Sequence, residues 1–146
     1  RGVLMAARAC HILEYEAQEL LRADGYRTQV LPKNNARNAL PLCIIAFRPP
    51  GETRYVRVLT VDRKDPGPED VERCCGKEII LYRTILARVP VDPGLHCEIW
   101  LSAPKTGLHC FEITPGSIVP IPVPNPPGAG SLAGRIRCPL LARGRP

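Results

Sequence analysis

Apolar residues recur at helical spacing near the start of the chain. Between Arg8 and Asp24 they repeat every three or four positions, which is typical of an amphipathic helix. The residues that carry this pattern are Ile12, Leu13, Ala17, Leu20 and Leu21. Gly25 follows, and glycine commonly ends helices because it adopts left-handed backbone angles without strain. The pattern predicts a first helix over residues 8–24.

Three segments after this helix have the character of strands. Residues 26–31 alternate between apolar and polar side chains, which favours a half-exposed strand. Residues 40–47 form a short continuous apolar run, which is typical of a strand buried on both faces. We therefore expect 40–47 to be the central strand of a sheet. A third strand is predicted over 55–61, after the turn sequence PPGET.

The second half of the chain predicts helix and then strand. A helical region begins at Pro68, runs to about Arg88 and should break at Gly76. Strands over 97–102 and 109–114 should form a hairpin across APKTG. The resulting order, one helix, three strands, a helical region and two strands, predicts an α/β sandwich: a mixed central sheet of four or five strands flanked by helices.

The C-terminal region has too much proline to continue this architecture. Residues 115–146 contain eight of the 17 prolines, so they should supply at most an edge segment. No acid follows Glu112, whereas four arginines do. We expect one domain over 8–122 and a disordered Pro/Gly/Arg-rich tail over 123–146.

Composition favours a soluble protein of the cytoplasm. No apolar run approaches the roughly 18 residues that a membrane helix needs, so no membrane association is expected. The seven cysteines are an odd number and are scattered along the chain, which fits a reducing compartment. We expect most of them to be buried as small apolar side chains.

Positive charge is concentrated in one part of the chain. The formal net charge is +6, and residues 22–64 alone hold nine Lys/Arg against three acids. Such a cluster can bind the phosphates of nucleic acid, although a solvated surface with ordinary charge scatter would look the same. The candidate nucleic-acid-binding residues on the strands and loops are Arg48, Arg54, Arg57, Arg63 and Lys64.

Several kinds of functional site lack support in the sequence. LHCEI and LHCFEI place His96, Cys97, His109 and Cys110 on two strands, but neighbouring strand residues point to opposite faces, so four zinc ligands cannot converge there. No phosphate-binding glycine loop and no serine-hydrolase motif is present. We expect neither a bound metal nor a small-molecule cofactor.

Several strings, taken with the element order, resemble a nuclease superfamily. They are EYEAQELLRADGY (14–26), LPLCIIAF (40–47), RYVRVLTVDRK (54–64) and CEIWLS (97–102). Together they resemble the PD-(D/E)XK, or restriction-endonuclease-like, superfamily, and most closely its archaeal Holliday-junction resolvases. The resemblance covers residues 8–121. It implies a restriction-endonuclease-like αβββαβ fold.

The resemblance also implies a magnesium site that this chain matches only in part. In the family, a helix acid, an aspartate opening the second strand and an acid-x-Lys on the third strand hold Mg²⁺. Glu16 matches the helix acid, with Glu14 as the alternative, but the aspartate position falls on Cys43, or on Leu42 if the register slips. The acid-x-Lys falls on Arg57-Val58-Leu59. A thiol and a guanidinium are poor replacements, because Mg²⁺ selects oxygen ligands.

Three functions remain open at this point. The leading hypothesis is a catalytically degenerate nuclease-like domain that binds nucleic acid. The second is a protein-interaction scaffold or homodimer subunit in which Trp100 anchors the partner. The third is an active Mg²⁺-dependent endonuclease or Holliday-junction resolvase, in which an extended third strand would bring Asp62 and Lys64 to Glu16.

Overall fold

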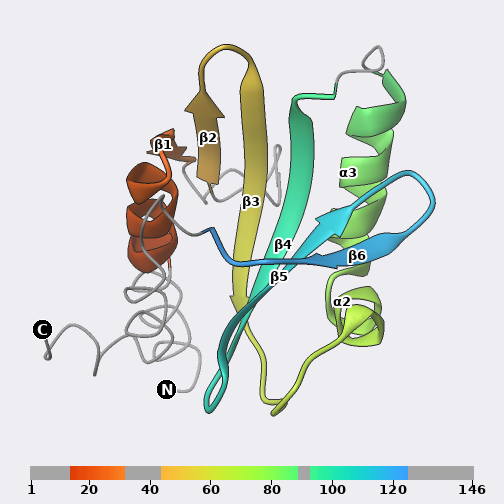
Figure 1. The fold of residues 1–146 in the computed structure, drawn as a ribbon. Helices are drawn as coiled ribbons and strands as arrows, with labels where there is room; N and C mark the ends of the chain where they lie inside the picture. The colour runs from red at the N-terminus through yellow and green to blue at the C-terminus, as the bar shows by residue number, and fades with distance from the viewer. Residues whose placement is uncertain (1–13, 32–43, 89–92, 125–146) are drawn as a thin grey trace, which may run out of the picture.

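The computed structural model describes residues 14–31, 44–88 and 93–124 (Figure 1). The first helix occupies 14–23 of these residues. The other elements, in chain order, are β1 (Arg27–Val30), β2 (Ile44–Arg48), β3 (Glu52–Thr60), α2 (Pro68–Cys74), α3 (Gly76–Arg88), β4 (Leu95–Ala103), β5 (Gly107–Ile113) and β6 (Ile118–Ile121). The predictions for residues 8–13, Cys43 and the tail from 125 lie outside the described residues.

The strands form one six-stranded mixed sheet in the order β1-β2-β3-β4-β5-β6. β3 and β4 are parallel and are joined by the α2–α3 crossover, whereas every other neighbouring pair is antiparallel. The predicted α/β architecture with a mixed sheet is confirmed. β6 is the predicted edge segment, and it raises the strand number above the expected four or five.

The main correction to the predicted sheet concerns which strands are central. β3 and β4 lie in the middle, while β2 is second from an edge. The apolar run 40–47 was expected to be buried on both sides, but Phe47 in β2 is 43% exposed. A short apolar run shows that a segment is hydrophobic, and it does not show how many strands will pair outside it.

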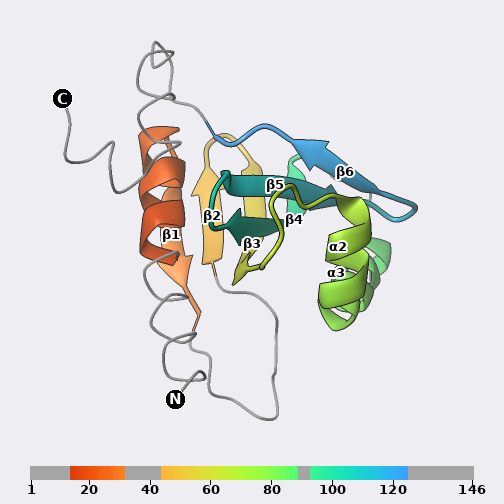
Figure 2. The ribbon, with the colours of Figure 1, turned by 90° about the horizontal axis from the view of Figure 1, so that it is seen from below.

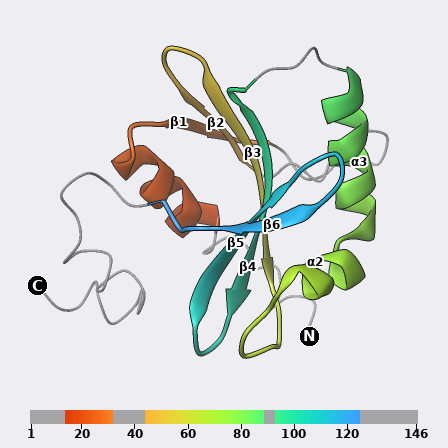
Figure 3. The ribbon, with the colours of Figure 1, turned by 45° about the vertical axis from the view of Figure 1, so that its right-hand side comes forward.

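Helices cover both faces of the sheet and create two hydrophobic clusters (Figures 2 and 3). The first helix packs on one face, where Ala17 and Leu21 contact a cluster that includes Val56, Val58 and Trp100. α2 and α3 pack on the opposite face, where Ile79 and Tyr82 are buried with residues of β4 and β5. Val123 packs against the first cluster and Pro124 is buried, so the folded domain extends past the predicted boundary at Pro122.

The helical region breaks where the sequence predicted. α2 ends at Cys74 and α3 begins at Gly76. Cys75, between them, is buried, as are Cys97 and Cys110, whereas Cys74 is exposed. Burial raises the pKa of Cys75 and of Cys97 to about 12, which keeps both thiols protonated. None of the described helices is long and apolar enough to cross a membrane.

Asp70 fixes the start of α2. Its side chain is 1% exposed, accepts a hydrogen bond from the Gly67 backbone N–H at 2.8 Å and pairs with Arg73 and Arg63. The Gly67 bond lowers the pKa of Asp70, and the two arginines add to this effect. The charged form therefore stabilises the folded state above the unfolded pKa, and this stabilisation is lost as pH falls through the lowered folded pKa.

Asp70→Asn should therefore change how stability depends on pH. We expect the variant to be less stable than the parent at neutral pH and the difference to shrink as pH falls below about 4, where the Asp70 carboxylate of the unfolded chain begins to be protonated while that of the folded chain, with its lowered pKa, keeps its charge longer. Urea unfolding from pH 7 to pH 3 measures this difference. Glu69→Gln, at an exposed position of the same helical turn, is the control. An equal loss at every pH would contradict the role given to the Asp70 charge.

Candidate functional site

The sheet face under the first helix is where a nuclease-like metal site would have to lie. In such a site the acid-x-Lys side chains of β3 must point toward the first helix, because the acid on that helix binds the same metal ion. β3 turns Arg54, Val56 and Val58 to that face, and the acid with the same alternation, Glu52 at the start of the strand, pairs with Arg48. Val56 and Val58 are fully buried against Ala17 and Leu21. Apolar side chains therefore fill the part of this face that lies against Ala17 and Leu21.

The positions assigned to the family motif fall on the other face. Arg57 lies 3.7 Å from Glu78 of α3, and Leu59 packs against the cluster under α2 and α3. Arg57-Val58-Leu59 therefore places its two outer residues away from Glu16. The sequence showed that neighbouring residues of this strand point to opposite faces. It did not show which of the two faces the first helix covers.

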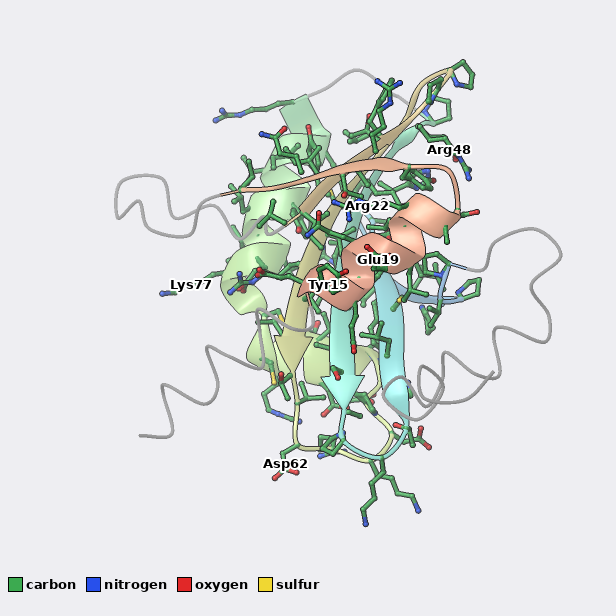
Figure 4. The ribbon with its side chains drawn as sticks, turned by 90° about the vertical axis from the view of Figure 1, so that its left-hand side faces the viewer. Tyr15, Glu19, Arg22, Arg48, Asp62 and Lys77 are labelled. Atoms are coloured by element: carbon green, nitrogen blue, oxygen red, sulfur yellow. The ribbon has the colours of Figure 1, made fainter. Side chains whose placement is uncertain are left out.

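The alternative carboxylate and lysine do not join the sheet. β3 ends at Thr60, and Asp62, Arg63 and Lys64 lie exposed in the loop that follows. Figure 4 shows Asp62 beyond the end of the sheet, separated from Tyr15 and Glu19 on the first helix. The strand extension that would bring Asp62 and Lys64 to Glu16 does not occur. Glu16 is half-buried and Glu14 is buried on that helix.

No group of three or more His, Cys, Asp or Glu side chains among the described residues is arranged to hold a metal ion. His96 and Cys97 point to opposite faces of β4, as expected from alternation, since Cys97 packs under α3 and His96 contacts Glu112. Cys43, which the resemblance would place at the aspartate position, lies outside the described residues.

The most concentrated polar chemistry is a buried network centred on Glu98. This β4 carboxylate is 2% exposed, and its Oε1 accepts hydrogen bonds from Trp100 Nε1 at 2.9 Å and Arg54 Nη1 at 3.2 Å. Arg54 Nε donates to the Tyr26 hydroxyl at 3.0 Å. Burial raises the pKa of Glu98, while Arg54 and Trp100 oppose this by stabilising the carboxylate. The network links the end of the first helix to the two central strands.

A second arginine completes the link to the first helix. The Arg48 guanidinium lies 4.4 Å from the Tyr26 ring centroid and donates from Nη1 to the Asp24 carbonyl at 2.8 Å. Arg48 also pairs with Glu52, and this contact lowers the pKa of that carboxyl. Arg54 lies 5.1 Å from the same ring centroid. Tyr26 is thus held by two arginines, in a favourable cation–π arrangement.

A half-exposed histidine–carboxylate pair lies on the same sheet face. His96 Nδ1 is 2.8 Å from Glu112 Oε2, and each side chain is about a quarter exposed. His96 is the register partner of Arg54, and Glu112 is that of Glu98. In the sequence, His96 was considered only as a candidate zinc ligand. The network was not predicted, because its members meet through strand pairing: Arg54 is 44 positions from Glu98 and 28 positions from Tyr26. One sequence signal could have indicated the network: the polar residues His96 and Glu98 alternate with apolar residues in β4.

The five predicted nucleic-acid-binding residues do not form one surface. Arg48 and Arg54 belong to the network described above, Arg57 faces α3, and Arg63 pairs with the buried Asp70. Lys64 is exposed and forms no ion pair within the described part of the chain. The cationic strand patch that the sequence predicted is therefore divided between two faces, and most of its charge is balanced by acids.

Charge is distributed unequally between the described residues and the rest of the chain. Outside the described ranges there are eight Lys/Arg but one acid, Asp92. The described residues hold the other twelve cations and thirteen acids, which gives them a formal charge of −1. The positive excess lies in residues 1–13, 32–43 and 125–146.

Trp100 cannot act as the exposed anchor of a protein interface. It is fully buried, as are Ile99 and Leu101 beside it in β4. The prediction that Trp100 anchors a partner is therefore wrong. β4 is covered on both sides, so its large side chains stabilise the domain.

Comparisons with known proteins add no family assignment. The sequence matches no protein-family model, and no curated protein and no solved structure matches it significantly.

Proposed function

We propose that the chain is a nuclease-like domain that has lost the metal-dependent centre and binds nucleic acid through sequence-independent phosphate contacts. The element order supports the nuclease-like part: a helix, an antiparallel three-stranded meander, a helical crossover and a parallel fourth strand. This is the αβββαβ order of the restriction-endonuclease-like fold that the sequence resembles.

The loss of catalysis is supported by the packing under the first helix. Mg²⁺-dependent phosphodiester cleavage needs clustered oxygen ligands that activate water and neutralise charge on the phosphate. Val56 and Val58 occupy the β3 positions that face this helix, and both are fully buried. Introducing two carboxylates there would require the core to open.

The binding part of the proposal rests on one observation, the charge of the C-terminal segment: no acid follows Glu112, whereas Arg135, Arg137, Arg143 and Arg145 do. Cations without nearby acids attract phosphate, whereas the strand arginines Arg48, Arg54 and Arg57 pair with acids. We therefore assign the nucleic-acid contacts to the four C-terminal arginines.

Salt dependence of binding tests this assignment. We expect the full chain to bind a 20-base-pair duplex with an affinity that falls as salt rises, and replacement of the four C-terminal arginines by glutamine should reduce the log–log slope by about 3 to 4. Fluorescence anisotropy with labelled duplexes of unrelated sequence gives both the slope and the lack of sequence preference. Arg57→Gln with Arg63→Gln is the control and should change the slope by less than about 1. A log–log salt slope near zero for the unsubstituted chain would contradict the proposal.

Cleavage assays test the loss of activity separately. The protein should leave linear and four-way-junction DNA intact in Mg²⁺ or Mn²⁺. Cleavage that disappears in Glu16→Gln or Asp62→Asn would show that an active centre exists and that the endonuclease hypothesis is correct.

A further inference from the structure

We propose that the segment Arg143-Gly144-Arg145 binds in the minor groove of duplex DNA and favours runs of A·T base pairs. This inference rests on the nucleic-acid binding proposed above, and it names the kind of duplex that the C-terminal arginines prefer. It adds a contact inside a groove to the contacts with phosphates, which every duplex offers alike.

The described domain leaves such a contact to the C-terminal segment. The arginines of β2, β3 and the loop after β3 are held by acids: Arg48 by Glu52, Arg54 by Glu98, Arg57 by Glu78 and Arg63 by Asp70. An arginine that enters a groove must first leave its acidic partner, and this costs free energy, most of all where the partner is buried. Residues 113–146 contain no acid, so the arginines there have no acidic neighbour along the chain.

The spacing of the two arginines fits the repeat of the base pairs. Arg143 and Arg145 are two positions apart. In an extended chain, side chains with this spacing point to the same side and lie about 6.4 to 6.8 Å apart. Two base-pair steps of B-DNA span about 6.8 Å. An extended segment that follows the groove can therefore direct both guanidinium groups to the groove floor.

The residue between the arginines favours the narrow groove of an A·T run. The minor groove of B-DNA is about 6 Å wide, and runs of A·T pairs narrow it further and strengthen its negative potential, which attracts arginine. Gly144 has no side chain, so the backbone between Arg143 and Arg145 can approach the groove closely. Arg135 and Arg137 have the same spacing but are separated by the branched side chain of Ile136. We therefore assign the groove contact to the second pair.

The chemistry of the groove floor gives the same preference. A·T pairs present only acceptors in the minor groove, adenine N3 and thymine O2, whereas G·C pairs add the guanine N2 amino group as a donor. A guanidinium group is a donor only, so it can bond to the acceptors and is opposed by the amino group. The floor does not distinguish A·T from T·A. The preferred target is therefore a run of A·T pairs in any order.

Three labelled duplexes of equal length separate the groove contact from the phosphate contacts in the full chain. Their central block is A·T, G·C or inosine·C, and inosine lacks the N2 amino group of guanine but keeps its major-groove edge. We expect the A·T and inosine·C duplexes to bind about tenfold more tightly than the G·C duplex in fluorescence anisotropy. The duplexes used to measure the salt slope should contain no A·T run.

The outcomes distinguish this inference from the proposed function. Equal affinity for all three duplexes with a steep salt slope would overturn the groove contact and leave phosphate binding in place. No binding to any duplex would contradict both. Tighter binding to A·T than to inosine·C would show that the thymine methyl group is read in the major groove, and this would also overturn the inference.

Charge-matched variants locate the contact on the chain. Arg143→Gln with Arg145→Gln should reduce the tenfold preference to less than about twofold. Arg135→Gln with Arg137→Gln removes the same charge and should weaken binding to all three duplexes alike, with the preference kept. Gly144→Val keeps the charge and should lower the preference by about threefold. A preference that survives the first double substitution, or disappears in the second, would contradict the assignment.

Discussion

Arg54→Met should lower the free energy of unfolding by about 3 to 5 kcal/mol, because it leaves the Glu98 carboxylate buried without its cationic partner. Glu98 is 2% exposed, so water cannot solvate its carboxylate in place of the lost guanidinium. The substitution also removes the hydrogen bond to the Tyr26 hydroxyl and one of the two guanidinium groups that contact the Tyr26 ring. Urea denaturation at pH 7 measures the loss.

The same substitution at Arg57 is the matched control. Arg57 lies on the same strand but faces α3, and its Nε is 3.7 Å from the Glu78 carboxylate, which is 17% exposed where Glu98 is 2% exposed. Arg57→Met leaves a better-solvated carboxylate behind, so it should cost less than Arg54→Met, about 1 to 2 kcal/mol. Combining Arg54→Met with Glu98→Leu should recover part of the loss, since no unpaired charge remains. Equal losses at Arg54 and Arg57 would show that the Glu98 network has no special role in stability.

Trp100→Ala should be comparably severe, with a loss of about 3 to 5 kcal/mol. The indole is fully buried against the first helix and packs with Ala17, Leu21 and Val58. Its removal leaves a cavity and takes one hydrogen-bond donor from the buried Glu98 carboxylate. Chemical denaturation followed by circular dichroism measures the change without relying on the tryptophan signal.

Trp100→Phe separates the two contributions. Phenylalanine keeps most of the apolar contact but cannot donate to Glu98, so we expect an intermediate loss of about 1 to 3 kcal/mol. A Phe variant as unstable as the Ala variant would show that packing around the ring contributes little. Full stability of the Phe variant would show instead that the Trp100–Glu98 hydrogen bond does not matter.

Much of the fold followed from local patterns because their physical causes are local. The helical repeat before Gly25, the break at Gly76 and the hairpin through residues 104–106 are set by side-chain spacing and by residues with special backbone preferences. The same patterns could not rank the strands by position in the sheet. Residues 40–47 are more continuously apolar than 55–61, yet β3 is central and β2 is not.

The candidate site could not be assembled in the same way. The charge of Arg54 is visible in the sequence, but its function as the partner of Glu98 depends on the parallel pairing of β3 with β4. Arg48, Arg57 and Arg63 likewise looked like one cationic group, because they are close along the chain. Strand alternation and chain reversal send them to different faces and different acidic partners.

By itself, the sequence determined which segments become helix and strand and where the turns between them lie. Only the tertiary structure decided which face the first helix covers, that Trp100 is internal, and that β6 pairs with only part of β5. The reason is that local preferences act over a few residues, whereas strand order, register and burial depend on contacts between segments far apart in the chain.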